Sequence, residues 1–423
     1  MILYLTISII ILSLFYYARI KQVGFALIPL LVLVFEIGKN ISGILMIDTG
    51  YNGYMFLMLF IFIIQYYYIR DNRLGNSKVY KNALFILIIM TIYFIFRLDI
   101  SFANIFNIIT RFGNFILILF LFFVSYKWFD NIHRLFMLNH YFILSVVIYI
   151  LFTITLSLLK VGETAYTGGI IRGPTQFQLY FAVLPLILSF MINILNKKQI
   201  NKYNTKSTTL YIIYSICILI VALSLMRTTW LMLAVGVFVF IFSIQKNKTN
   251  RRLLAFVLLI IAASIIILIN TDILDVRRDR FSDNYDINEE GRIIEIELVN
   301  YSLNSNNTLI FGEGNLFNAR DKYGFSRYSR PLHGTYANIL FGSGYLGLAL
   351  YILFFIMILY SFIKIKSNNV ITNTMKATGL AVLFAVMTAY FSANTTYGYG
   401  ISYFILSFVY LGALLRLSET YNV

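Results

Sequence analysis

The chain has 423 residues, of which 60% are hydrophobic and only 12% are charged. A water-soluble fold with this composition would expose more apolar surface than solubility tolerates, so the composition excludes a soluble protein and indicates a polytopic membrane protein. The single cysteine excludes a disulfide framework or a cysteine-built zinc site, and the distribution of the formal net charge of +16 argues against nucleic acid.

Thirteen apolar runs are long enough to cross about 30 Å of hydrocarbon. We expect the first to be a retained span, because Arg19 and Lys21 follow it and no cleavage site marks it as a signal peptide. The amino terminus then lies outside the cytoplasm. The predicted spans are residues 2–18, 23–38, 54–69, 82–96, 105–126, 135–159, 176–195, 208–226, 228–244, 253–270, 335–363, 370–391 and 401–415.

Basic residues are divided unequally between the two sides of these spans. One side receives 20 Lys and Arg against three acids, whereas the other holds the remaining 14 against 15 acids. The positive-inside rule therefore places the first side and the C-terminus in the cytoplasm. Most basic residues on the outer side are arginine, whose planar guanidinium group can bind a carboxylate or phosphate from two directions. The alternative explanation is that arginine is better tolerated near lipid headgroups.

Residues 271–332 form a long outer segment between two predicted spans, and most other connections are short. Asp286 and Glu289 have capping-box spacing before a helix expected over 291–303, and Asn306-Asn307 predicts a turn. We therefore expect a small folded cap. The predicted organisation is membrane helices over 1–270, the extracytoplasmic cap over 271–332, and membrane helices over 333–423.

Candidate chemical groups gather on the predicted outer side. His333 is the only one of the three histidines there, at the mouth of a span where an imidazole can accept a proton from a hydroxyl. A structural interfacial histidine is the alternative. Arg227 lies between two spans with no acid nearby in sequence, so we expect either an anionic ligand or a snorkelling side chain. The further outer arginines considered are Arg111, Arg172, Arg278, Arg280 and Arg292.

Several nucleotide-dependent and hydrolytic chemistries are excluded by absent motifs. The sequence has no P-loop, no dinucleotide-binding fingerprint, no His-Glu-x-x-His motif and no nucleophile elbow. The predicted cytoplasmic loops are short and lysine-rich, so we expect the energy for a reaction to arrive with its substrate.

The pair His333-Gly334, followed by Gly344-Tyr345-Leu346-Gly347, is similar to a signature of the O-antigen ligase and Wzy-type O-antigen polymerase family. In that signature a His and a small polar residue precede Gly-x-x-Gly by nine residues. The chain departs from it at Gly334, where the family usually has Asn, Ser or Gln.

Other elements between residues 165 and 350 support the same resemblance. Gly291-Arg292 and Gly312-Glu313-Gly314 resemble the family's Gly-Arg and Gly-x-Gly elements in its large outer loop. Arg172-Gly173-Pro174 and Met226-Arg227-Thr228 resemble its arginines beside mid-chain spans.

The resemblance implies an all-α integral membrane protein with about 12–13 transmembrane helices and a GT-C-like fold. It implies a metal-independent, inverting glycosyltransferase with no cofactor, which polymerises undecaprenyl-diphosphate-linked oligosaccharides at the outer face of the bacterial cytoplasmic membrane. Membrane lipids, a chain-length regulator and a flippase are further expected partners. The expected roles are catalysis by His333 and Arg292, diphosphate binding by Arg172, Arg227, Arg278 and Arg280, and glycan binding by Glu313, Tyr336 and Tyr397.

Two other functions remain open from the sequence. A ligase that moves the finished glycan to another acceptor would share the same motifs and carrier. A flippase or other transporter for lipid-linked oligosaccharides would also need many spans, but transporters often contain two related halves, and no internal repeat is visible here.

Overall fold

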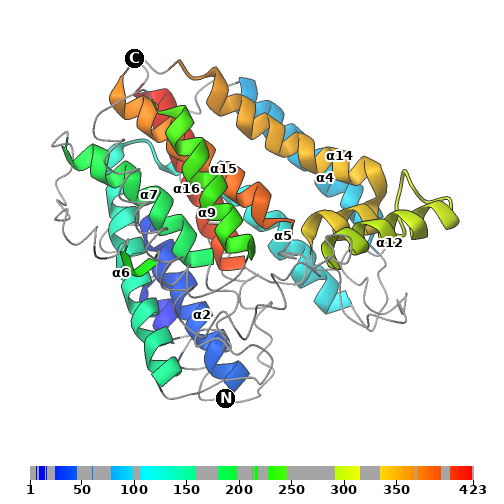
Figure 1. Cartoon of the computed structure of the whole chain (residues 1–423), viewed down its shortest axis with the longest axis horizontal. Helices are drawn as coiled ribbons and strands as arrows, with labels where there is room; N and C mark the ends of the chain where they lie inside the picture. The colour runs from blue at the N-terminus through cyan, green and yellow to red at the C-terminus, as the bar shows by residue number, and fades with distance from the viewer. Residues whose placement is uncertain are drawn as a thin grey trace, which may run out of the picture.

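The computed structural model describes most of the predicted helices and part of the long outer segment. The described residues are 24–44, 78–98, 105–158, 180–197, 227–244, 291–314, 334–366, 369–391 and 401–421, with a few isolated positions before residue 218. Within these ranges every regular element is a helix (Figure 1).

The helix boundaries agree closely with the apolar pattern. Every α-helix in the described ranges overlaps a predicted span except α12, which matches the helix expected over 291–303. The predicted spans 2–18, 54–69, 208–226 and 253–270 lie largely outside the described residues, as do the proposed domain boundaries, which therefore stay predictions. The elements are η1 (Gly24–Leu27), α2 (Ile28–Ile44), α4 (Lys78–Phe96), α5 (Ile105–Trp128), α6 (Ile132–Leu158), α7 (Tyr180–Lys197), α9 (Arg227–Ser243), α12 (Gly291–Ser305), α14 (Thr335–Lys364), α15 (Val370–Ala389) and α16 (Ile401–Thr420).

Five of the described helices are long and apolar enough to cross a membrane. They belong to α5, α6, α14, α15 and α16, and shorter apolar helices occur in α2, α4 and α9. A helix satisfies its own backbone hydrogen bonds, which makes it one of the few structures that can cross lipid. The described chain is therefore that of an all-α membrane protein, as the composition predicts.

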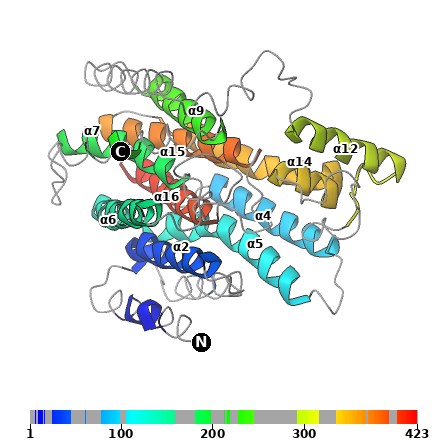
Figure 2. The same ribbon diagram turned by 60° about the horizontal axis from the view of Figure 1, so that its bottom comes forward.

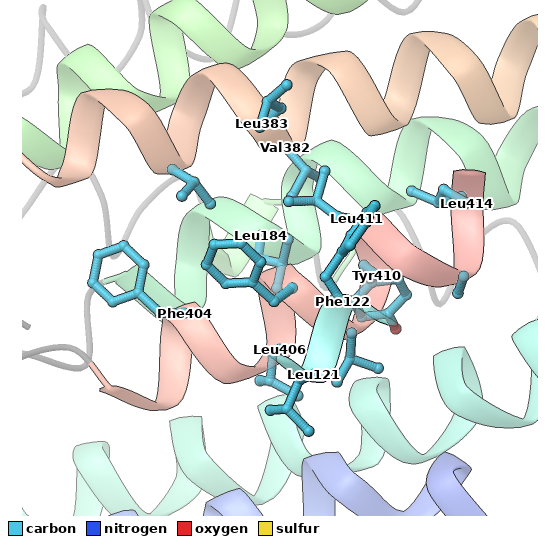
Figure 3. Packing of buried hydrophobic residues seen from close by; sticks show 14 of the residues in the cluster. Leu121, Phe122, Leu184, Val382, Leu383, Phe404, Leu406, Tyr410, Leu411 and Leu414 are labelled. Carbon is cyan, nitrogen blue, oxygen red and sulfur yellow. The ribbon is translucent and has the colours of Figure 1, made fainter. Parts of the chain in front are cut away.

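Helix α16 forms the centre of the bundle. Every side chain from Tyr403 to Leu415 is buried, and the helix packs between α5 and α15. Gly412 is needed at the α5 crossing, because a Cβ there would lie 2.2 Å from the carbonyl O of Phe122. Figure 3 shows the resulting core, built from Leu121 and Phe122 of α5, Leu184 of α7, Val382 and Leu383 of α15, and Phe404, Leu406, Tyr410, Leu411 and Leu414 of α16.

Helices α4, α12 and α14 form one side of the molecule. Helix α14 lies along α4, and α12 lies against the first part of α14, far from α2 and α6 (Figures 1 and 2). A small separate core joins Val299 and Leu303 of α12 to Leu340 and Phe341 of α14. The described residues 291–314, part of the segment predicted to lie outside, are thus packed on the bundle.

Polar contacts link α5, α15 and α16 near the C-terminus. The Tyr126 hydroxyl donates to the Glu419 carboxylate, and the Arg416 guanidinium lies 5.6 Å from the centre of the Tyr126 ring. The side chains of Asn369 and Thr372 both donate to the carbonyl O of Tyr421, at 2.6 and 2.9 Å. These bonds join the start of α15 to the end of α16.

The span predicted over 335–363 matches α14, which is long and apolar enough to cross a membrane. The sequence pattern does not show that this helix is broken at Gly344, which has φ 66° and ψ −170°, outside the helical region. A positive φ favours glycine, which has no Cβ to clash with the following carbonyl. The break divides α14 into a first segment, residues 335–343, and a second segment, residues 345–364.

We predict that Gly344→Ala destabilises the fold. A non-glycine residue at positive φ costs about 1–2 kcal/mol, and the new methyl would lie 2.3 Å from the carbonyl O of Ile310. The unfolding temperature in detergent should fall by several degrees. Gly236→Ala is the control, since its methyl meets the Cδ1 end of the Ile187 side chain at 2.6 Å and the nearest backbone atom of another helix, Ala381 O, at an ordinary 3.6 Å. Equal unfolding temperatures for the two variants would contradict this explanation of the break.

Candidate functional site

The break in α14 brings together two glycine elements that are about 30 residues apart in the sequence. The chain after α12 runs beside the break, and four backbone hydrogen bonds join the two segments, which we call the glycine joint (309–314 and 341–346). The bonds run from Glu313 N to Phe341 O (2.8 Å), Gly314 N to Gly342 O (2.9 Å), Tyr345 N to Leu309 O (2.9 Å) and Leu346 N to Ile310 O (3.1 Å).

Glycine is required on both sides of this joint because the two backbones almost touch. A Cβ on Gly312 would lie 2.4 Å from the amide N of Gly344, 2.6 Å from that of Ser343 and 2.7 Å from the carbonyl C of Gly342, all of them backbone atoms. Gly312 and Gly314 also have φ of 73° and 80°. The Gly-x-Gly and Gly-x-x-Gly elements found in the sequence are therefore two halves of one structural unit.

Glu313, predicted to bind glycan, lies within the glycine joint. Its Oε1 accepts hydrogen bonds from the Thr308 hydroxyl at 2.6 Å and from the Asn306 side-chain amide at 3.0 Å. Both donors belong to the turn after α12, where Asn307 has φ 57° and confirms the expected turn at Asn306-Asn307. The carboxylate is therefore held in place by the turn. Its contact with glycan stays a prediction.

Tyr93 of α4 and Arg97, the residue that follows this helix, hold both halves of the joint, and neither was singled out from the sequence. Arg97 Nη2 donates to the carbonyl O of Gly312 at 2.6 Å, and the Tyr93 hydroxyl donates to the carbonyl O of Ser343 at 2.7 Å. In sequence, Arg97 is one more arginine after an apolar run and cannot be distinguished from a snorkelling residue. No sequence signal identifies its distant partner.

The start of α14 is fixed against the end of α15, next to the predicted catalytic histidine. The amide N of Thr335 donates to the carbonyl O of Tyr390 at 2.9 Å, and a Cβ on Gly334 would lie 2.6 Å from the carbonyl O of Phe391. This close approach explains why position 334 is glycine. His333 itself lies outside the described residues.

Tyr336, the second predicted glycan-binding residue in the described ranges, is packed between helices. Its hydroxyl donates to the carbonyl O of Met387 at 3.1 Å. Its ring contacts those of Tyr351, Tyr390 and Phe391, with ring centres 5.0–6.0 Å apart. These contacts give Tyr336 a structural role in joining α14 to α15, and its predicted contact with glycan remains untested.

Three of the candidate arginines have a described backbone position, and one of them, Arg111, lies in α5 and is partly buried. Arg292 is the second residue of α12, the helix that packs on the first segment of α14. Arg227 is the first residue of α9, which packs against α15 and α7. Arg172, Arg278, Arg280 and Tyr397 lie outside the described residues, so whether these groups share a site with His333 stays a prediction.

Neither metal-binding geometry nor comparison with known proteins assigns a further function to the described residues. Within the described ranges, no group of three or more His, Cys, Asp or Glu side chains is arranged to hold a metal ion. No protein-family model matches the chain, and no curated protein matches it significantly in sequence.

We predict that Arg97→Met loosens the glycine joint. A hydrogen bond from a charged donor contributes about 1.5–3 kcal/mol, so the amides of Glu313 and Gly314 should exchange with deuterium about 10 to 100 times faster. Peptide-resolved hydrogen exchange in detergent measures this directly.

Arg134→Met is the matched control for that experiment. Arg134 also donates to a backbone carbonyl, that of Trp128 at 2.5 Å, but in the corner between α5 and α6. Its removal should leave exchange at residues 309–314 unchanged. If both variants accelerate exchange there equally, Arg97 does not act on the joint specifically.

Proposed function

We propose that the protein is a polysaccharide polymerase, an inverting glycosyltransferase that joins undecaprenyl-diphosphate-linked repeat units at the outer face of the bacterial cytoplasmic membrane. The glycine joint is the observation that carries the proposal. Gly312-Glu313-Gly314 and Gly344-Tyr345-Leu346-Gly347 resemble separate elements of the O-antigen polymerase and ligase family, and in this structure they contact each other. Chance resemblance of two unrelated short motifs gives no reason for such contact.

The joint also supports the role proposed for His333, the third element of the resemblance. It fixes the direction of the first segment of α14, whose first residues directly follow His333. Hydrogen bonding to Tyr390 fixes the same segment at its other end. A general base must be held within hydrogen-bond reach of the hydroxyl that it deprotonates. A helix segment fixed at both ends is a suitable support for that task.

The proposed reaction exchanges one bond to the anomeric carbon of the donor glycan for another. A hydroxyl oxygen of the acceptor sugar attacks that carbon from the face opposite the diphosphate, and the bond from the carbon to the diphosphate oxygen breaks. His333 takes the hydroxyl proton. Undecaprenyl diphosphate leaves with the bonding electron pair, and Arg172, Arg227, Arg278 and Arg280 stabilise its negative charge.

Arg292 and Glu313 have supporting roles in this proposal. Arg292 lies on α12, which packs on the segment that follows His333, and it completes the catalytic pair. Glu313, held by its hydrogen bonds with Thr308 and Asn306, accepts hydrogen bonds from sugar hydroxyls in this proposal. Tyr336 and Tyr397 flank the glycan. About 12–13 spans and a GT-C-like arrangement complete the proposed architecture.

We predict that His333→Ala, Arg172→Ala and Arg292→Ala each abolish polymer formation without unfolding the protein. Removal of a general base lowers a rate by about 10² to 10⁴, and removal of a charge-stabilising donor has a similar effect. Glycan length on a gel, with purified protein and a defined lipid-diphosphate oligosaccharide, measures the loss. His140→Ala, an exposed histidine on α6, is the control. Wild-type polymer from all three variants would refute the proposed site.

The same assay separates the rival functions. Long glycan made from repeat units alone identifies a polymerase, whereas transfer only to a distinct acceptor identifies a ligase. A transporter would make no new glycosidic bond in either case.

We further expect polymer formation to continue at an unchanged rate after treatment with a chelator. The proposed mechanism stabilises the leaving diphosphate with guanidinium groups and uses no metal ion. The measurement is the initial rate with and without chelator. A rate that falls on chelation and returns on addition of a divalent cation would contradict the metal-free mechanism.

A further inference from the structure

An exposed apolar patch lies on the outer surface of the glycine joint. Ile310 and Phe311 are 61% and 55% exposed, and Tyr345 and Leu346 on the facing segment are 48% and 40% exposed. The backbone bond from Leu346 N to Ile310 O places the two pairs side by side. We call these four residues the joint patch.

The joint patch is continuous with an exposed apolar stripe along the second segment of α14. The stripe has the three- and four-residue spacing of one helical face, so it begins at the joint and follows the helix to its end. An exposed stripe of this kind on a membrane-crossing helix is the surface that faces acyl chains. It consists of Ile352, Leu353, Ile356, Tyr360 and Ile363.

The length of the second segment places the patch at the boundary of the hydrocarbon. About 20 residues separate Tyr345 from Lys364, and at about 1.5 Å per residue they span about 30 Å, the thickness of the hydrocarbon layer. Lys364 and Lys366 are exposed and mark one boundary. The break at Gly344 then lies at the other boundary, with the joint patch beside it.

The surroundings of the patch have the composition of a membrane interface. The Tyr345 hydroxyl donates to Asn300 Oδ1 at 2.9 Å, so its ring is apolar on one side and its polar end points back to α12. Tyrosine with one apolar and one polar end is typical of the headgroup level. The end of α12 and the turn that follows it are polar, with Asn304 and Ser305 of the helix and Asn306 and Asn307 of the turn exposed.

We propose that the joint patch inserts into the boundary between headgroups and acyl chains of the same bilayer that α14 crosses. The segment 309–314 is then a membrane anchor that fixes the depth of the glycine joint. Its occupant is lipid, because the patch continues a lipid-facing stripe and ends where the polar residues of α12 begin. This inference rests on the membrane location of α14 alone, and it holds whether or not the protein transfers glycans.

Collision accessibility of nitroxide spin labels in proteoliposomes tests the depth of the patch. Labels are placed on single cysteines in a Cys217→Ala background, at Phe311→Cys and Leu346→Cys. Oxygen concentrates among acyl chains, and a water-soluble nickel chelate stays in the aqueous phase. Asn304→Cys is the aqueous reference and Ile356→Cys is the reference for the hydrocarbon interior, since both native side chains are exposed.

We expect the ratio of oxygen to nickel accessibility at both patch positions to be several-fold above that at residue 304 and below that at residue 356. A ratio equal to that at residue 304 would place the patch in water and overturn the proposal. Exclusion of both reagents would mean that protein, such as a second copy, covers the patch, and would also overturn it. If Cys217→Ala does not fold, the wild-type background is used, with unsubstituted protein as the labelling blank, because Cys217 is buried.

Discussion

The backbone hydrogen bonding across the break in α14 is the interaction on which the rest of this side of the molecule depends. A helix can leave its regular path near a membrane only if other groups satisfy the amides and carbonyls that the break releases. Here the chain after α12 supplies them, and Tyr93 of α4 and Arg97 just after α4 hold both partners. The described residues 291–314 are therefore packed into the helical bundle.

The two ends of the bundle are closed in different ways. Near the C-terminus, side chains of α15 donate to the carbonyl of Tyr421, and Tyr126 pairs with Glu419. At the joint, backbone pairs with backbone at glycines that cannot accept a side chain. The first kind of contact tolerates substitution by similar side chains. The second kind restricts the sequence to glycine, which is why short motifs mark one end of the bundle and not the other.

Hydropathy and spacing predicted most of the helices and the helix over 291–303, because each is a local property of the sequence. The break at Gly344 was missed, since an apolar run with three glycines is compatible with a continuous helix and its cause lies 30 residues upstream. The glycine elements were identified one by one, but their contact is a long-range pairing that spacing does not encode. Arg97 was overlooked for the same reason. The predicted meeting of His333 with Arg172, Arg278 and Arg280 concerns residues beyond those described.

The pairing at the joint has a consequence for how an anion can be bound there. Glycine-rich turns commonly cradle phosphate with their free amides, and Gly312-Glu313-Gly314 has the composition of such a turn. Yet the amide of Gly312 donates to Thr308, and those of Glu313 and Gly314 donate to Phe341 and Gly342. A phosphate bound to these amides would have to displace the hydrogen bonds that stabilise the break in α14. The amides of these three residues are therefore already used within the fold, and a phosphoryl group beside this turn would be bound by other groups, such as the guanidinium groups of the proposed site.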